Sequence, residues 1–132
     1  MTGHLVDTRL LLWFVLEPGR LTQRAARLLA DRAVPAVYSL ASIWEVAIKT
    51  SLRKPGFDVD PELLRGFLTD EGFTELPIAP THIAQVATLR WLHRDPFDRM
   101  LVAQASVEGL TLLTRDAGRY STYFPRLRVI AP

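Results

Sequence analysis

Cysteine is absent from the 132-residue sequence. This absence excludes a disulfide framework, a thiol nucleophile and any metal site built on cysteine. Long apolar runs are also missing, because the longest, residues 10–16, is far too short to cross a bilayer. Lysine is scarce, since 14 of the 16 basic residues are arginine. Arginine suits bidentate contacts with phosphate, but a GC-rich genome produces the same bias.

The composition is that of an ordinary globular protein, with 48% hydrophobic and 23% charged residues. The formal net charge of +2 is mild and indicates no particular partner. No repeat, linker or low-complexity segment divides the chain, so we expect residues 1–132 to form a single domain. A basic segment followed by an apolar segment and a cleavage site is not seen at the start, so a cytoplasmic location without membrane contact is expected.

Short apolar segments alternate with helical patterns along the chain. Strands are predicted at residues 5–8, 36–38, 74–78, 111–114 and 128–130. Helices are predicted at residues 10–16, 22–32, 41–53, 61–70, 81–92 and 96–108. In the helix at 81–92, the residues predicted to face the core are Ile83, Val86, Ala87 and either Leu89 or Arg90. This alternation favours an α/β fold with a short, mostly parallel central sheet of about five strands flanked by helices.

The segment at residues 93–105 has the features of a helix start. Asp95 suits the N-cap, Pro96 the first helical position, and Asp98 the first turn, where the helix dipole favours negative charge. Apolar residues then recur at helical spacing, so the helix is expected to pack on the core through Leu101, Val102 and Ala105.

Four acids occupy comparable places in the predicted elements. Asp7 and Asp116 come directly after strands, while Glu45 and Asp98 lie in the first turns of helices. In open parallel sheets, ligands bind beyond the carboxyl ends of the strands. The four side chains can therefore meet in one acidic pocket.

Each acid also has a purely structural interpretation. Asp7 can cap the helix that follows it, and Asp98 can stabilise the first turn of its own helix. Glu45 lies four residues before Lys49, which is an ordinary helical ion pair, and Asp116 can be a turn residue. The joint interpretation is favoured because all four structural roles would otherwise coincide at one edge of the sheet.

Clustered carboxylates repel one another, so such a pocket must take up protons or bind cations. Ligands that are all oxygen suit Mg²⁺ or Mn²⁺, which lower the pKa of bound water and stabilise displacement at phosphorus. The predicted reaction is therefore phosphodiester hydrolysis. Three nearby arginines are either contacts for flanking phosphates or surface residues: Arg94, Arg99 and Arg115.

Several segments, in this order and spacing, resemble PIN-domain proteins and, more narrowly, the VapC toxins of type II toxin–antitoxin systems. The similarity covers residues 5 to 130. Its motifs are Val6-Asp7-Thr8 with Leu11-Leu12-Trp13, Ser42-Ile43-Trp44-Glu45-Val46-Ala47-Ile48-Lys49, the segment 93–105, and Leu113-Thr114-Arg115-Asp116.

The resemblance implies an Mg²⁺- or Mn²⁺-dependent ribonuclease. Asp7, Glu45, Asp98 and Asp116 would be the first to fourth acids around the metal, and Asp95 would remain a cap. Thr114, and with it Thr8, would hold the carboxylates or a metal-bound water. Arg9 stands where relatives often have histidine, which leaves the role of this position open, and residues 120–130 follow the family pattern only loosely.

The same resemblance implies partners. VapC-like proteins are usually homodimers held inactive by a cognate VapB-type antitoxin, and the pair commonly binds its own promoter DNA through the antitoxin. Trp13, Phe14 and Trp91 are candidates for these contacts, or for the core.

Other functions remain possible. The main alternative is a PIN-like module that binds RNA or an antitoxin without cutting, although a binding surface gains nothing from an acidic pocket that faces phosphates. A phosphoacceptor signalling domain normally needs a lysine at a late strand end, and neither Lys49 nor Lys54 lies there. An aspartyl-phosphate phosphatase would need a second aspartate two residues after Asp7, where the chain has Arg9.

Overall fold

The computed structural model describes residues 2–90, 95–116 and 128–130. They contain a five-stranded sheet in the order β3-β2-β1-β4-β5, in which every pairing is parallel. The strands are β1 (His4–Val6), β2 (Ala36–Ser39), β3 (Thr74–Leu76), β4 (Thr111–Leu113) and β5 (Arg128–Ile130). The α/β fold with a parallel sheet of about five strands is therefore confirmed.

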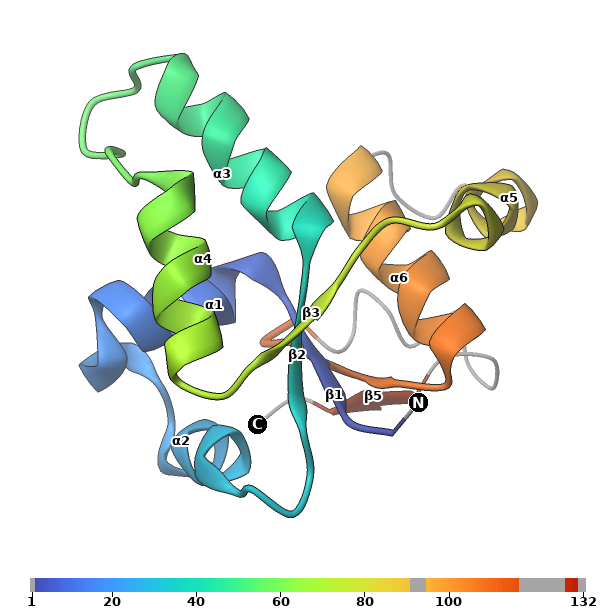
Figure 1. The fold of residues 1–132 in the computed structure, drawn as a ribbon, viewed down its shortest axis with the longest axis horizontal. Coiled ribbons are helices and arrows are strands. Elements are labelled where there is room, and N and C mark those ends of the chain that lie inside the picture. Colours follow the sequence, from blue (N-terminus) through green and yellow to red (C-terminus); the bar gives the residue numbers. More distant parts are fainter. Residues whose placement is uncertain (1, 91–94, 117–127, 131–132) are drawn as a thin grey trace.

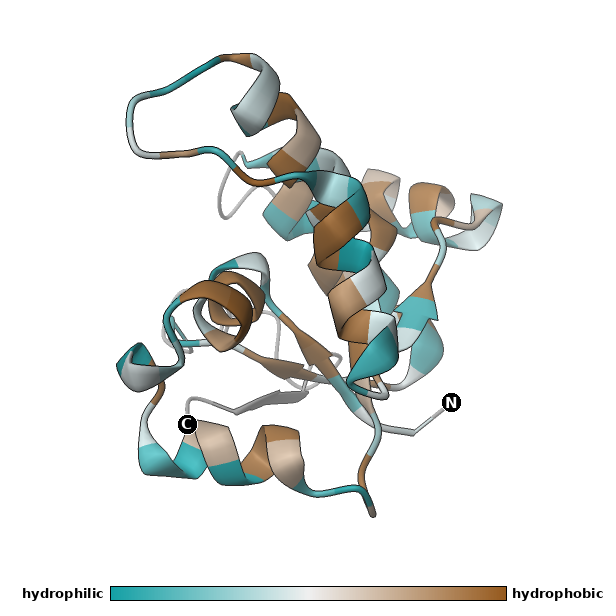
Figure 2. Cartoon of the chain, turned by 60° about the vertical axis from the view of Figure 1, so that its left-hand side comes forward, coloured by the Kyte–Doolittle hydropathy of each residue, from teal (hydrophilic) through white to brown (hydrophobic). Residues whose placement is uncertain are grey.

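Helices cover both faces of this sheet (Figure 1). They are α1 (Thr8–Leu16), α2 (Gln23–Ala30), α3 (Leu40–Ser51), α4 (Pro61–Asp70), α5 (Pro80–Thr88) and α6 (Pro96–Glu108), with a 3₁₀ turn at Pro18–Arg20. One buried apolar cluster lies between α6 and one face of the sheet. A larger cluster lies between the opposite face and the four helices α1, α2, α3 and α4. Figure 2 shows the pattern: the central strands are mostly hydrophobic, whereas α2 carries both hydrophobic and hydrophilic residues.

The helix ends follow local sequence signals. Asp60 and Asp95 each cap a helix that begins with proline, and each side chain accepts two backbone N–H bonds. Gly109 ends α6 in the left-handed conformation, with φ of 68°. These three signals place α4 and α6 where the sequence predicted them.

Several predicted elements are longer than the observed ones. The third strand ends at Leu76 rather than at residue 78, because Pro77 has no N–H to donate to the sheet. The second helix begins after Thr22, whose hydroxyl accepts the Ala25 N–H. Sequence pattern alone places such boundaries only to within a few residues.

The inner face predicted for residues 81–92 is confirmed at Val86 and Leu89, which are partly buried, and wrong at Ile83 and Ala87, which are exposed. Ile83 is 59% exposed, whereas His82 is buried at 1% exposure. His82 Nδ1 accepts the Ala79 N–H at 2.9 Å and lies 3.3 Å from Gln104 Nε2 on α6. This polar pairing turns His82 inward, and Val86, one helical turn further along, follows it on the same face.

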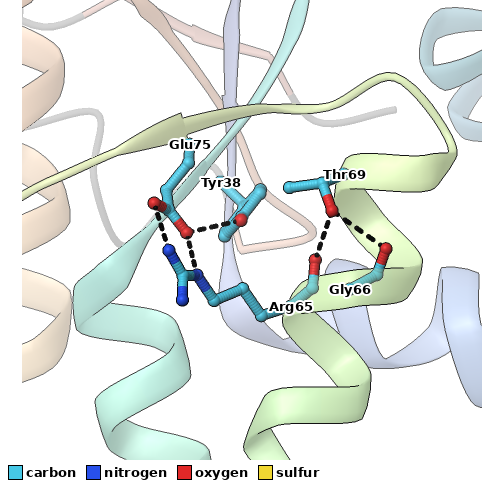
Figure 3. A network of polar contacts seen from close by, with 5 residues as sticks. All are labelled: Tyr38, Arg65, Gly66, Thr69 and Glu75. Carbon is cyan, nitrogen blue, oxygen red and sulfur yellow. Dashed lines mark hydrogen bonds and ion pairs between the residues drawn. The ribbon is translucent and has the colours of Figure 1, made fainter.

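A polar network ties α4 to the sheet (Figure 3). Glu75 on β3 accepts the Tyr38 hydroxyl at 2.7 Å and forms a bidentate ion pair with Arg65 on α4. The Arg65 hydrogen bond is the main reason why the pKa of Glu75 lies below its usual range. Burial, followed by the hydrogen bond to Glu75, raises the pKa of Tyr38. The network therefore stays charged on Glu75 and neutral on Tyr38 at ordinary pH.

Gly3 allows the start of β1 to lie close to Pro35, the residue that precedes β2. Its φ is 140°, and a Cβ atom there would lie 2.6 Å from the Pro35 carbonyl oxygen. The adjacent His4 N–H donates to this same oxygen at 2.9 Å. Only glycine fits this contact without displacing the backbone.

Some sequence predictions fall on residues that the structure does not describe. Arg94, Trp91 and residues 120–127 lie outside the described ranges. Trp13 and Phe14 are partly buried and pack against the larger apolar cluster. No helix in the described parts of the chain is both long enough and apolar enough to cross a membrane.

Candidate active site

The four predicted acids line one hollow of roughly 200 Å³. Parallel strands end at a common edge, so β1, β2 and β4 bring the segments that follow them together. The helix α6 precedes β4 instead of following a strand, and its N-terminus reaches the same edge because it runs back along the sheet. The full lining is Asp7, Thr8, Arg9, Leu12, Glu45, Lys49, Asp95, Asp98 and Asp116.

Asp7, at the end of β1, is a buried acid with 8% exposure. Its carboxylate accepts the Leu10 N–H at 2.8 Å and so caps α1. Burial raises the pKa of the Asp7 carboxyl, and the nearby Asp116 adds to this, whereas hydrogen bonds from Thr114 and Leu10 lower it. The capping interpretation and the pocket interpretation are therefore both true of this residue.

Glu45 lies in the second turn of α3, and its side chain is 10% exposed. Its carboxylate forms the helical ion pair with Lys49, with 2.7 Å between Nζ and Oε2. On the same helix, the Ser42 hydroxyl accepts the Thr8 hydroxyl at 2.8 Å, which links α1 to α3. These contacts fix the wall of the hollow that faces Asp7.

Thr114 links the two acids that follow strands. It is fully buried, hydrogen bonds to the Asp7 side chain, and accepts the Asp116 N–H at 3.1 Å. Asp116 is more open, with its side chain 51% exposed, and Arg9 Nη1 lies 4.0 Å from its carboxylate. The rim formed by Asp116 and Arg9 is thus the solvent side of the site.

Asp98 enters the hollow from the first turn of α6. Its backbone N–H donates to Asp95 Oδ1 at 3.2 Å, so the predicted capping role of Asp95 is confirmed. The Asp95 side chain nevertheless lines the hollow as a fifth carboxylate. Among the described residues, five acids and two cations line this small volume, so acids outnumber cations there.

The predicted phosphate contact of Arg99 is not compatible with its position. Arg99 is 4% exposed, and its guanidinium donates to the carbonyls of Val86, Leu89 and Arg90 at 2.9 to 3.4 Å. It therefore holds the end of α5 against α6. Arg115 is exposed beside the hollow, where its guanidinium lies over the Trp13 ring.

The donor set fits a hard divalent cation in its chemistry. Among the described residues that line the hollow, all candidate ligands are oxygen atoms of carboxylates, with no sulfur or imidazole. No group of three or more His, Cys, Asp or Glu side chains within the described ranges is already arranged to hold a metal ion. The side chains would have to draw together around an ion.

Sequence reasoning did not predict that the cations Arg9 and Lys49 line the hollow, or that Ser42 hydrogen bonds to Thr8. Neither Lys49 nor Arg9 is assigned to the acidic pocket from the sequence. Ser42 lies three residues before Glu45, and this spacing puts both on one helix face, which is a usable signal. The approach of Arg9 to Asp116 has no local signal, because it depends on how α1 meets β4.

The protein is thus an α/β domain with a parallel sheet and an acidic hollow at the ends of its strands. The sequence matches the PIN domain family over residues 4–125. The chain therefore belongs to the PIN domain family. No curated protein is similar enough in sequence to give a match.

Solved structures with the same fold include VapBC proteins and another toxin–antitoxin complex. VapBC from Salmonella typhimurium, bound to DNA, has a TM-score of 0.71 at 14% identity, with 98% of both chains covered. VapBC2 from Rickettsia felis, bound to a fragment of its promoter, has a TM-score of 0.70 at 16% identity, again with 98% of both chains covered. A toxin–antitoxin complex from Klebsiella pneumoniae has a TM-score of 0.64 at 21% identity and covers 97% of this chain and 96% of that chain. At these identities the likeness shows the fold, and the resemblance to VapC-type PIN domains is confirmed at that level.

Proposed function

We propose that this protein is a metal-dependent endoribonuclease and the toxin of a VapBC-type toxin–antitoxin pair. The observation that carries the proposal is the convergence of Asp7, Glu45, Asp98 and Asp116 in one hollow, although they come from four separate parts of the chain. An acidic hollow of this kind costs stability through repulsion and desolvation. A function that needs clustered carboxylates accounts for that cost.

The four acids would hold Mg²⁺ or Mn²⁺, which when bound would neutralise their charge and activate water for attack at phosphorus. Hydrolysis forms one bond from the water oxygen to phosphorus and breaks one phosphorus–oxygen bond of the RNA backbone. Thr114 would hold Asp7 and the Asp116 backbone in place through its hydrogen bonds to both. Thr8, through its bond to Ser42, orients the wall next to Glu45.

An antitoxin partner is proposed from the VapBC neighbours and from the surface of the chain. Large apolar side chains are exposed on α1 and α4, with Leu16 at 55%, Leu63 at 73% and Phe67 at 41% exposure. Exposed apolar groups on neighbouring helices are typical of protein-binding surfaces. We propose that a VapB-type antitoxin covers such a surface, that the toxin forms a homodimer, and that promoter DNA is bound through the antitoxin.

One observation favours the alternative of a catalytically silent PIN-like module that binds RNA or an antitoxin. Two of the acids already face cations, Glu45 with Lys49 and Asp116 with Arg9. These contacts compete with metal binding. They are also exposed enough to exchange for it, since the Lys49 and Asp116 side chains are 43% and 51% exposed.

The deciding experiment is cleavage of a mixed cellular RNA pool by purified protein free of antitoxin. Reactions with Mg²⁺, with Mn²⁺ and with EDTA are compared for the parent, for Asp98→Asn and for the control Asp70→Asn, an exposed acid at the end of α4. Discrete fragments are expected with metal in the parent and control and not in Asp98→Asn. The Asp98→Asn variant should fold as well as the parent or better, because it relieves repulsion between like charges.

Two results would contradict the proposal. Absence of cleavage by folded parent protein, while Mn²⁺ still raises its unfolding temperature, would favour the silent module. A large loss of thermal stability in Asp98→Asn would assign this residue a structural role at the start of α6.

A further inference from the structure

Three buried polar side chains form a chain of hydrogen bonds on the α6 side of the sheet. They are Ser39 at the end of β2, His82 on α5 and Gln104 on α6, and each has at most 1% exposure. Burying polar groups costs stability unless they are hydrogen bonded. Gln104 lies at the centre of the chain, because its amide contacts both of the other side chains. These three residues are not part of the lining of the acidic hollow.

The donor and acceptor roles in this chain are fixed by the backbone groups around it. The Pro77 carbonyl can only accept, and Gln104 Nε2 donates to it at 3.3 Å. The amide oxygen of Gln104 must then face Ser39, whose hydroxyl donates to it. The Ser39 oxygen keeps its lone pairs for the Ala41 N–H, which donates to it at 2.9 Å and so begins α3. Gln104 therefore has a single orientation, and it orients the cap of α3.

His82 extends the chain to α5. Its Nδ1 accepts the Ala79 N–H at 2.9 Å, so this nitrogen carries no proton and can also accept from Gln104 Nε2, which is 3.3 Å away. The proton of the ring then lies on Nε2, which is 3.6 Å from a carboxylate oxygen of Glu108. Gln104 is thus tied to the segment after β3 as well as to the cap of α3.

The bond between Ser39 and Gln104 is equally far along the chain from two of the clustered acids. Glu45 lies six residues after Ser39 on α3, and Asp98 lies six residues before Gln104 on α6. Figure 1 shows the two helices beside each other where α3 leaves β2. Six helical residues rise about 9 Å, so a tilt of about 10° of one helix at this bond moves its acid by about 1.6 Å.

A metal site of oxygen ligands is sensitive to displacements of this size. Mg²⁺ needs nearly octahedral ligands at about 2.0–2.1 Å, and Mn²⁺ prefers the same kind of site. We propose that Gln104 is a positioning residue that holds α3 against α6 through its bond to Ser39. It thereby keeps Glu45 and Asp98 near enough to draw together around a small divalent cation. This inference rests on the proposed metal-dependent function and adds a residue that prepares the site before the ion binds.

Mn²⁺ binding tests this role without relying on RNA cleavage. Purified protein is titrated with Mn²⁺, the free ion is measured by electron paramagnetic resonance, and the temperature is one at which every variant is folded. Gln104→Met replaces the amide with an apolar chain of similar length. It should raise the Kd for Mn²⁺ at least about tenfold, because losing a residue that supports metal ligands typically weakens affinity about 10–100-fold.

Further variants separate positioning from a general loss of stability. Ser39→Ala removes the other half of the bond, so it should raise the Kd similarly, and the double variant with Gln104→Met should show little further increase. Ser39→Thr keeps the hydroxyl and should restore most of the affinity. Leu68→Ala truncates the apolar cluster on the opposite face of the sheet, so it should lower the unfolding temperature and leave the Kd within about twofold of the parent.

Hydrogen exchange of the metal-free protein gives a second readout. The Ala41 amide, which donates to Ser39, should exchange at least about tenfold faster relative to the amides of α4 in Gln104→Met, and not in Leu68→Ala. A folded Gln104→Met with the Mn²⁺ affinity of the parent would overturn the proposal, as would an equal rise in Kd in Leu68→Ala. If the parent binds no Mn²⁺, the proposed metal site fails, and unchanged exchange at Ala41 in Gln104→Met would refute the positioning role independently.

Discussion

Arg99 offers a sharp test of how the structure assigns roles, because its burial contradicts a contact with phosphate. Its guanidinium donates to the Arg90 carbonyl at 2.9 Å and to those of Val86 and Leu89 at 3.3 and 3.4 Å. A hydrogen bond from a charged donor contributes about 1.5–3 kcal/mol, and the two longer bonds lie at the weak end. Replacing Arg99 with methionine, which keeps an apolar stem, leaves these carbonyls without that donor and should cost about 3 kcal/mol of unfolding free energy.

The assay is thermal and urea unfolding of purified protein, followed by circular dichroism. For a domain of this size, a loss of about 3 kcal/mol corresponds to a fall in unfolding temperature of about 10 °C. Arg99→Lys keeps one charged donor and should fall between the parent and Arg99→Met. The matched control Arg24→Met removes an exposed arginine of α2 and should shift the unfolding free energy by no more than about 0.5 kcal/mol.

A phosphate-binding role predicts the opposite pattern. In that case Arg99→Met would weaken RNA binding and leave the unfolding temperature unchanged. An unfolding temperature within about one degree of the parent would refute the assignment of Arg99 to the α5–α6 contact, since the lost bonds would then carry no net stability.

Three further changes test other parts of the structure. Glu75→Gln should lower the unfolding free energy by about 1–2 kcal/mol at neutral pH. Because the pKa of Glu75 is lowered in the folded protein, the stability that this carboxylate contributes is present above the ordinary pKa of 4.5 and is lost as the pH falls through the folded pKa. Urea titrations across pH should therefore show the stabilities of parent and variant converging in acid. The same substitution removes the negative charge next to the Tyr38 hydroxyl, so the pKa of Tyr38 should fall part of the way toward its ordinary value in a spectrophotometric titration, while burial still raises it. Gly3→Ala places a methyl group against a backbone carbonyl at positive φ and should cost about 1–3 kcal/mol, measured by thermal unfolding. Lys49→Met leaves Glu45 buried without its counter-charge and should cost about 1–2 kcal/mol without metal, and Mg²⁺ should recover more stability in this variant than in the parent.

Local signals in the sequence were enough to place much of the fold. The Asp-Pro pairs that begin at Asp60 and Asp95 start α4 and α6, and Gly109 ends the latter, because capping depends on neighbouring residues alone. The meeting of the four acids followed from topology, since every strand of a parallel sheet ends at the same edge.

What the sequence could not supply were contacts between distant elements. His82 and Ile83 are adjacent on α5, and His82 is the buried one, where it accepts the Ala79 N–H and lies against the amide of Gln104 on another helix. The burial of Arg99 has the same origin, because carbonyls at the end of α5 satisfy it and no pattern within α6 reveals them. Hydrophobic periodicity describes one helix at a time, and polar pairing between helices lies beyond it.

The pairing of β1 with β4 has a consequence for synthesis of the protein. His4 pairs with Ala36 of β2 on one side and with Thr111 of β4 on the other, so nearly the whole chain must be made before the second neighbour of β1 is available. Loops of this length close slowly, and the contact between them is made late in folding. The carboxylates after these two strands can come together only once that contact exists, and a chain still emerging from the ribosome has not yet assembled its acidic hollow.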